Sequence, residues 1–185
     1  RLLAAYVTGH QTHMPETLPE LHTLPQINII ACGTAYYAGL HGKTMLEQFA
    51  KVPVNVDTAS EFRYRKPPYV KGGLFIAVSQ SGETADTLAA LEDAKAHGQH
   101  ILVITNTPTS SMARAADTVL ELHAGPEIAV ASTKAFMAMQ MLLSLLALHS
   151  LQVQGQNIHK YIQDLRELPS KIQQVLAMKE PIKAL

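Results

Sequence analysis

The sequence predicts an α/β fold, a three-layer sandwich in which helices cover both faces of a five-stranded parallel, doubly wound sheet. Five short apolar runs alternate with longer segments whose apolar residues recur at helical spacing. Such alternation is typical of parallel sheets, because each pair of parallel strands is joined by a helical crossover. The length of 185 residues is enough for one substantial core of this kind.

The composition argues against several classes of partner. The formal net charge is +0 and no tract of lysine and arginine stands out, which argues against nucleic acid. The single cysteine, Cys32, can form no internal disulfide, which suits a reducing, cytoplasmic location. The apolar run that comes nearest to a membrane span, residues 137–148, is shorter than the roughly 20 residues required. We therefore expect neither a nucleic-acid nor a membrane partner.

Residues 1–24 precede the predicted sheet. Their leucines have a loose helical spacing that prolines break, which predicts a short helix or two outside the core, or a linker from a preceding domain. His10 and His13 have no evident third ligand, so we interpret them as exposed side chains and expect no metal. The first strand follows at residues 26–32, isoleucine-rich enough to be buried on both faces, with Cys32 as a small buried residue at its end.

The other strands are predicted where apolar runs recur, at residues 52–57, 73–78, 101–104 and 117–122. Pro53 places the first of these toward an edge of the sheet. Helices are predicted at residues 36–49, 59–65, 84–97, 133–148 and 156–178. From the first helix, the residues expected to face inward are Leu40, Met45, Leu46 and Phe49. The third should end at Gly98 as a left-handed C-cap, the fourth should be buried, and Pro169 should interrupt the last.

The chain is organised around the loop that joins the third strand to the third helix, Ser79-Gln80-Ser81-Gly82-Glu83-Thr84. The first N–H groups of a helix lack intrahelical partners and carry partial positive charge, so an anion placed there is stabilised. Ser79, Ser81 and Thr84 add hydroxyl donors, and Gly82 lets the backbone approach a ligand closely. The pattern indicates a site for a phosphate monoester.

A simpler interpretation is that Ser81 only caps the helix, with Thr84 in its first turn. Three hydroxyls at the carboxyl end of a buried strand favour a ligand instead, because open parallel sheets bind ligands at that edge. The loop lacks the signatures of nucleotide and dinucleotide sites, so a small phosphorylated metabolite is favoured and no cofactor is expected. Thr34 follows the first strand, and in a doubly wound sheet it can face the same crevice.

The loop before the fourth helix, residues 125–134, carries further candidates. Ser132 can cap that helix. Lys134 lies in the first turn, where a cation opposes the helix dipole, so we expect a nearby anion or partner to compensate it. The alternative is a lysine that simply reaches into solvent.

Four segments, in this order and at similar spacing, resemble the isomerase part of the glutamine–fructose-6-phosphate aminotransferase family, and in particular its first SIS (sugar isomerase) domain. They are Cys32-Gly33-Thr34, Ala59-Ser60-Glu61-Phe62-Arg63-Tyr64-Arg65, Ser79-Gln80-Ser81-Gly82-Glu83-Thr84-Ala85-Asp86-Thr87 and Val130-Ala131-Ser132-Thr133-Lys134-Ala135-Phe136. The resemblance runs from about residue 27 to the C-terminus. The third segment alone would indicate only an SIS domain, and the second and fourth make the resemblance specific.

The resemblance implies binding of fructose 6-phosphate or glucosamine 6-phosphate. The residues implied to bind are Thr34, Ala35, Ser79, Gln80, Ser81, Thr84, Val130 and Ser132, followed by Gly33, Gly82 and Lys134. Those of the serine-rich loop would hold the phosphate with Thr34 beside it, and Val130 and Ser132 would meet the hydroxyl end of the sugar. Ala35 stands where many relatives have serine, so one hydrogen bond of about 0.5–1.5 kcal/mol is absent.

The resemblance also implies a division into an N-terminal segment or linker (residues 1–24), an SIS domain (residues 25–150) and a C-terminal helix (residues 151–185) leading toward a second SIS domain. In the family, the acid and base groups of isomerisation belong to that second domain and its tail, and a glutaminase domain precedes the first. We therefore expect a homodimer that binds a hexose phosphate but has no catalytic residue of its own.

Two other functions stay open. A free-standing SIS module would sense a phosphosugar, although a chain that begins with Arg1 rather than methionine argues against it. A different phosphosugar isomerase or deaminase would need a catalytic carboxylate in the crevice, for which Glu61, Glu83 and Glu127 are the candidates. Glu83 is already explained by the helix dipole, and Glu127 by an exposed loop.

Overall fold

The computed structural model describes residues 1–128, 132–179 and 183. A parallel sheet with strand order β4-β3-β5-β6-β7 lies at its centre. The strands are β3 (Ile27–Ala31), β4 (Val54–Thr58), β5 (Leu74–Ser79), β6 (His100–Thr105) and β7 (Thr118–Glu121). The predicted five-stranded parallel sheet is confirmed, and the strand that follows Pro53 does lie at an edge.

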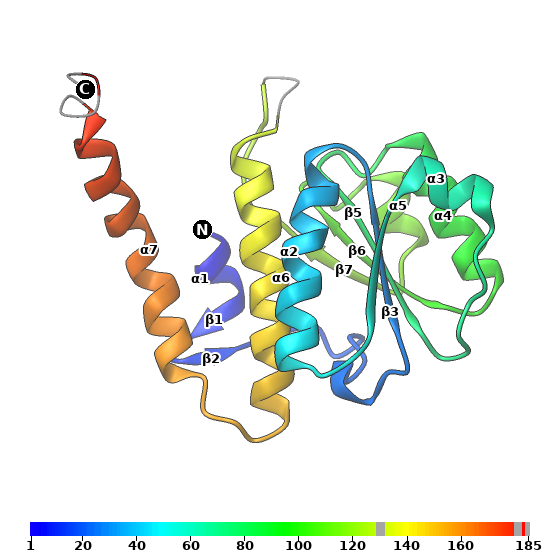
Figure 1. Cartoon of the computed structure of the whole chain (residues 1–185), viewed down its shortest axis with the longest axis horizontal. Coiled ribbons are helices and arrows are strands. Elements are labelled where there is room, and N and C mark those ends of the chain that lie inside the picture. The colour runs from blue at the N-terminus through cyan, green and yellow to red at the C-terminus, as the bar shows by residue number, and fades with distance from the viewer. Residues whose placement is uncertain (129–131, 180–182, 184–185) are drawn as a thin grey trace.

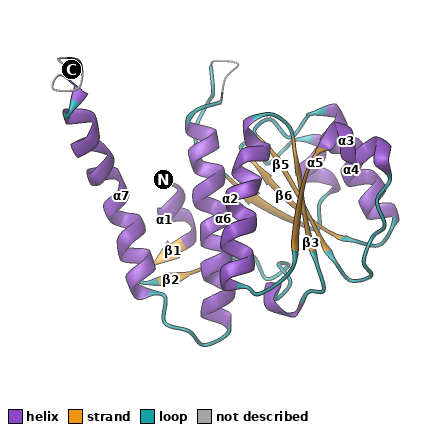
Figure 2. Ribbon diagram, viewed as in Figure 1, coloured by secondary structure: helices purple, strands orange, loops and turns teal. Residues whose placement is uncertain are grey.

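Helices cover both faces of this sheet (Figures 1 and 2). On one face lie α2 (Thr34–Phe49) and α6 (Lys134–Val153), and on the other α3 (Ala59–Arg65), α4 (Ala85–Ala96) and α5 (Ser111–Ala115). Side chains alternate along each strand, so Ile76 of β5 packs toward α2 and α6, and Phe75 packs toward α3 and α4. Every residue of β5 is buried, as expected for a parallel strand covered on both sides.

Small residues let α2 approach the sheet and α6 closely. Its buried residues are Ala35, Ala38, Gly39, Gly42 and Leu46. A Cβ atom at Gly42 would lie 2.8 Å from Leu143 Cδ1 of α6. The backbone of α2 at Gly42 therefore lies directly against the Leu143 side chain. The prediction that Leu40 faces inward is wrong, because this residue lies opposite the small-residue face and is 40% exposed.

Helix α6 is a buried core helix, as predicted, although it extends five residues beyond the predicted end at residue 148. It is also long and apolar enough to meet the length and composition criteria for a membrane span, with a mean hydropathy of 1.5. Half of that apolar window is buried inside the fold, mainly against α2 and the sheet. The burial accounts for its composition without a membrane.

The N-terminal residues form α1 (Leu2–Tyr6), a hairpin of β1 (Val7–Thr8) and β2 (Gln11–Thr12), and the short helix η1 (Leu21–Thr23). Tyr6 reaches the edge strand β7, where its hydroxyl donates to the Glu121 carbonyl (3.1 Å) and accepts from the Glu121 N–H (2.8 Å). An edge strand has unpaired backbone groups on its outer side. One tyrosine therefore satisfies both outer groups of this residue.

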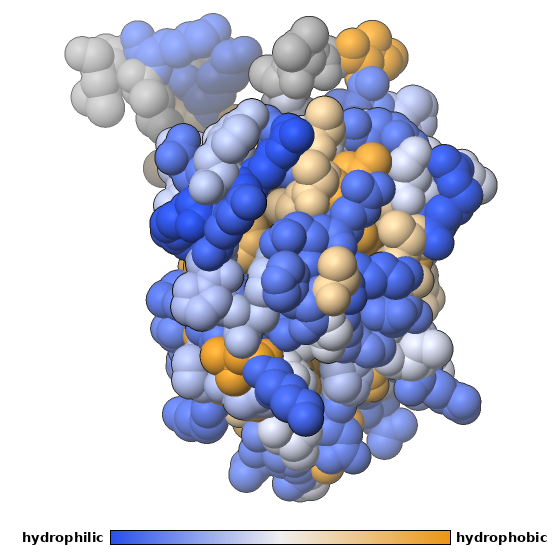
Figure 3. Space-filling view, turned by 90° about the vertical axis from the view of Figure 1, so that its right-hand side faces the viewer, coloured by the Kyte–Doolittle hydropathy of each residue, from blue (hydrophilic) through white to orange (hydrophobic). Residues whose placement is uncertain are grey.

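The last helix, α7 (His159–Ala177), projects away from the rest of the molecule at the left of Figure 1. Its start is anchored by Ile162, which is 0% exposed, whereas Leu176 near its end is 68% exposed. The predicted interruption at Pro169 is wrong, because the helix continues through this residue. Pro169 has no N–H to donate to the carbonyl four residues earlier. The helix is exposed here, so water can donate to that carbonyl instead. The opposite side of the molecule, which carries α3, α4 and α5, is hydrophilic over most of its surface (Figure 3).

Candidate functional site

The site lies where the strand order reverses. The chain passes from β3 to one neighbour, β4, and later returns to pair β5 on the other side of β3. The loops that follow β3 and β5 therefore diverge at the carboxyl edge and leave a crevice, the usual ligand position in open α/β sheets. A hollow of about 420 Å³ occupies this position, within the range of about 300–1,000 Å³ for ligand pockets.

Most of the predicted binding residues line this hollow. They are Gly33, Thr34, Ala35, Ser79, Gln80, Ser81, Thr84 and Ser132. Within the described part of the chain, Gly82 and Lys134 are not among the lining residues, and Val130 lies outside the described residues. The structure thus brings together the loops expected to share a crevice, while the role of each residue in binding stays a prediction.

The serine-rich loop is held in shape by its own hydroxyls. The buried Ser79 Oγ accepts a hydrogen bond from the Gly82 N–H at 3.1 Å and lies 3.1 Å from Thr84 Oγ1. Ser81 Oγ accepts from the Glu83 N–H at 3.2 Å, which leaves its O–H free to donate at the mouth of the hollow. The alternative interpretation that Ser81 only caps the helix does not hold, because α4 begins at Ala85 and Thr84 occupies the N-cap position.

Gly82 is the residue that makes this loop possible. Its φ of +68° lies in the left-handed region that disfavours other residues. A Cβ atom here would also lie 2.5 Å from Ser110 Cβ, with Ser110 Oγ closer still, and 3.0 Å from Thr105 Oγ1. The loop therefore rests directly on the segment after β6, and Ser81 and Thr84 are presented on its other side.

The described lining residues include no lysine or arginine, so an anion would be held by hydroxyls and N–H groups. Glu83 does not oppose it, because its carboxylate turns away and accepts a hydrogen bond from the Ser111 N–H of α5 at 2.7 Å. That hydrogen bond lowers the pKa of Glu83 below its usual value. The prediction that the dipole of the following helix explains Glu83 is wrong. Glu83 precedes α4, and its carboxylate instead accepts a hydrogen bond at the start of α5.

Glu127 holds the start of α6. Its carboxylate accepts hydrogen bonds from the N–H groups of Thr133 (3.0 Å) and Ala135 (3.2 Å), and these lower the pKa of Glu127. Glu127 thus does the capping predicted for Ser132, and it is the anion expected near Lys134, whose charge lowers the Glu127 pKa further. Sequence reasoning missed this role because a cap seven residues before the first residue of the helix leaves no local spacing signal. Ser132 lines the hollow, and its Oγ is buried with no protein partner among the described residues.

Two other lining residues differ from expectation. Cys32 was expected to be fully buried, but it is half-buried, lines the hollow and has its Sγ 3.7 Å from Thr87 Oγ1. Met139 of α6 also lines the hollow, and its place on a helix that is apolar nearly all round gave no reason to select it. Glu61, on α3, is exposed and is not among the described residues of the hollow.

Comparison with known proteins finds glutamine–fructose-6-phosphate aminotransferases among the relatives of this chain. A glutamine–fructose-6-phosphate aminotransferase (isomerizing) from Zymomonas mobilis is 49% identical over 176 residues, which are 93% of this chain and 29% of that protein. Another from Bradyrhizobium diazoefficiens is 47% identical over 190 residues, which are 99% of this chain and 31% of that protein. The chain therefore spans less than a third of the length of these curated relatives.

Among solved structures, the C-terminal domain of glucosamine-fructose-6-phosphate aminotransferase from Francisella tularensis is similar, with a TM-score of 0.89 and 36% identity. The match covers 98% of this chain and 52% of that one. A sequence model described as the SIS domain matches residues 20–149, well over half of the 185 residues. By this match and the fold, the chain belongs to the SIS domain family.

Proposed function

We propose that this chain binds fructose 6-phosphate between β3 and β5, as the first SIS domain of a glutamine–fructose-6-phosphate aminotransferase. The observation that carries the proposal is the convergence of the loops after β3 and β5 on one hollow, rich in hydroxyl and N–H donors. The relatives named for this substrate are similar over 93% to 99% of the chain, which includes every one of these loops.

The phosphate end of the ligand belongs at the start of α4. Ser81 and Thr84 present hydroxyls there, and the first N–H groups of α4 have no partners within the helix. A hydrogen bond to a charged oxygen contributes about 1.5–3 kcal/mol, and the helix dipole adds about 0.3–1 kcal/mol at an exposed site. These donors are enough to hold a phosphate dianion without a lysine or arginine.

The sugar end belongs on the side of α6. Ser132 lines the hollow, and its buried hydroxyl lacks a protein partner among the described residues, so rotation about its Cα–Cβ bond would let it bond to a ligand hydroxyl. Thr34 approaches from the loop after β3. Val130, placed next to the sugar by resemblance alone, would contribute its backbone.

The chain binds the sugar phosphate but does not complete its conversion. Moving a proton between adjacent carbons requires a base of suitable pKa near the sugar. Glu83 is not among the described residues of the hollow, and Glu127 lines it but is a weakened base, because its hydrogen bonds to the Thr133 and Ala135 N–H groups lower its pKa. Residues 151–185 then lead toward a second SIS domain that supplies the base, and a glutaminase domain supplies ammonia. The homodimer and the cytoplasmic location stay predictions.

Thermal unfolding with and without ligand tests the proposal. Fructose 6-phosphate at about 100 times its Kd should stabilise the chain by about 2.7 kcal/mol, which is about 5–11 °C for a domain of this size. Unphosphorylated fructose should give no shift, and a Ser81→Ala, Thr84→Ala variant should lose the shift with the sugar phosphate. A shift that persists in this variant would show that the phosphate binds elsewhere.

A further inference from the structure

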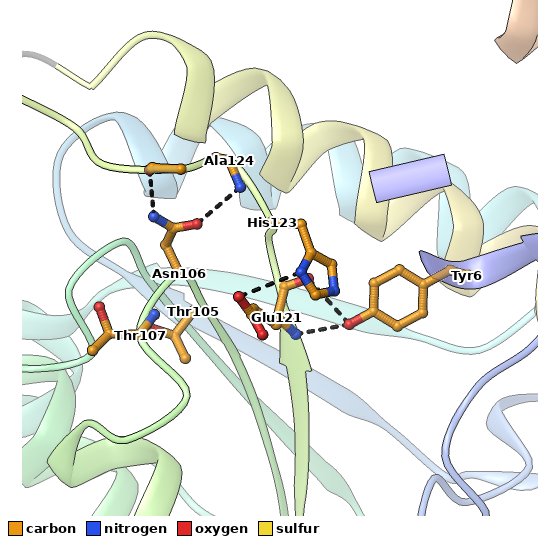
Figure 4. Close-up of polar contacts among 8 residues, drawn as sticks. Tyr6, Thr105, Asn106, Thr107, Glu121, His123 and Ala124 are labelled. Carbon is orange, nitrogen blue, oxygen red and sulfur yellow. Dashed lines mark hydrogen bonds and ion pairs between the residues drawn. The ribbon is translucent and has the colours of Figure 1, made fainter. Parts of the chain in front are cut away.

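Asn106, the residue immediately after β6, joins two loops through its side chain (Figure 4). Its Nδ2 donates to the Gly125 carbonyl at 2.7 Å, and its Oδ1 accepts from the Ala124 N–H at 2.9 Å. The backbone register between β6 and β7 ends one residue earlier, at Thr105 and Glu121. The amide of Asn106 therefore continues the pairing past the end of the sheet, because it offers one donor and one acceptor as a strand does.

The backbone of the same residue holds the serine-rich loop. The Asn106 N–H donates to the Gln80 carbonyl at 3.0 Å, and the Thr105 hydroxyl donates to that carbonyl at 3.3 Å. Gln80 lines the hollow between Ser79 and Ser81. Asn106 thus contacts the phosphate side of the hollow through its backbone and the segment after β7 through its side chain.

The segment after β7 leads directly to the other side of the hollow. Gly125 is two residues from Glu127, whose carboxylate caps α6 at Thr133 and Ala135. Two residues span at most about 7 Å, so the position of Gly125 restricts where the Glu127 carboxylate and the start of α6 can lie. Ser132, which lines the hollow, directly precedes Thr133.

We propose that Asn106 is a positioning residue that fixes the sugar-binding side of the hollow relative to the phosphate-binding loop. The ligand part of this inference rests on the proposed function, whereas the structural part does not. Aspartate cannot replace it, because a carboxylate accepts from the Ala124 N–H but cannot donate to the Gly125 carbonyl. Alanine removes both hydrogen bonds and keeps the backbone contact with Gln80.

Calorimetric titration of Asn106→Ala and Asn106→Asp with fructose 6-phosphate and with inorganic phosphate tests the ligand part. We expect the affinity for fructose 6-phosphate to fall about tenfold in both variants, and the affinity for phosphate to change by less than about twofold. Asn55→Ala is the matched control, since Asn55 of the edge strand β4 contacts Asn28 far from the hollow. It should change neither affinity. An equal loss for both ligands, or no loss for either, would overturn the proposal.

Amide hydrogen exchange tests the structural part without a ligand. In Asn106→Ala the amides of Ala124 and Ala135 should exchange faster than in the wild type, while the Gly82 amide, bonded within its own loop, should keep its rate. Unchanged exchange at Ala124 and Ala135 would overturn the positioning role. A wild-type chain that binds no fructose 6-phosphate would refute the proposed function instead, and the exchange result would still decide on Asn106.

Discussion

Replacement of Gly82 by alanine tests the packing beneath the serine-rich loop. The new Cβ would lie 2.5 Å from Ser110 Cβ, too close for two carbon atoms, at a φ of +68°. The left-handed conformation costs about 1–2 kcal/mol for a residue with a Cβ, and overpacking costs about 1–3 kcal/mol. We therefore expect the free energy of unfolding to fall by about 2–5 kcal/mol.

Urea unfolding of two comparison variants separates these contributions. Gly98 has a similar φ of +72°, but a Cβ there meets no atom within 4 Å. Gly98→Ala should therefore lose only the backbone part, about 1–2 kcal/mol. The double variant Gly82→Ala, Ser110→Gly removes the contacting side chain and should recover about 1–3 kcal/mol of the loss in Gly82→Ala.

Equal losses in the free energy of unfolding for Gly82→Ala and Gly98→Ala would refute this explanation, since the contact with Ser110 would then contribute nothing. The same change on Ser110→Gly in the wild type and in Gly82→Ala would refute it too. The coupling free energy is the difference between the effect of the double variant and the sum of the two single effects. A value below about 0.5 kcal/mol would mean that Gly82 and Ser110 act independently.

Two further predictions concern the edge of the sheet and the start of α6. Tyr6→Phe leaves the outer backbone groups of Glu121 without their partner and should lower the free energy of unfolding by about 1–3 kcal/mol in urea, whereas Tyr161→Phe, on an exposed helix, should change it by less than about 0.5 kcal/mol. The lowered folded-state pKa of Glu127 means that its hydrogen bonds stabilise the fold above the ordinary value of 4.5 and that this stability is lost as pH falls through the folded-state pKa. Wild type should thus lose more stability than Glu127→Gln between about pH 6 and about pH 3, and equal losses would contradict the capping role.

The sheet was predictable because its strands are buried on both faces. Continuous apolar runs such as residues 74–78 of β5 have few other stable placements, and each predicted strand lies within two residues of the observed one. The site followed from the same logic, since polar loops after parallel strands meet at one edge. Thr34 and the serine-rich loop could therefore be placed together before any coordinates were known.

The features that escaped prediction depend on contacts between distant residues. Nothing near Glu127 in the sequence indicates that its carboxylate caps α6, and nothing near Asn106 indicates that its side chain holds the loop after β7. The sequence alone could not exclude the alternative that Ser81 caps the helix, because the left-handed turn at Gly82 that moves the helix start to Ala85 is allowed but not required by the residue types. Leu40 was misplaced because small residues, rather than large ones, form the packed face of α2.

Fructose 6-phosphate is proposed to bind with its phosphate at the start of α4. A titration of the ¹⁵N-labelled chain with fructose 6-phosphate, followed by NMR, tests this proposal most directly. The largest amide shifts should fall in residues 81–87 and 33–35, and unphosphorylated fructose should leave these amides unchanged. Shifts of equal size with fructose would refute phosphate binding at α4, as would shifts that gather at the separate hollow lined by Lys43, Asn55 and Arg65.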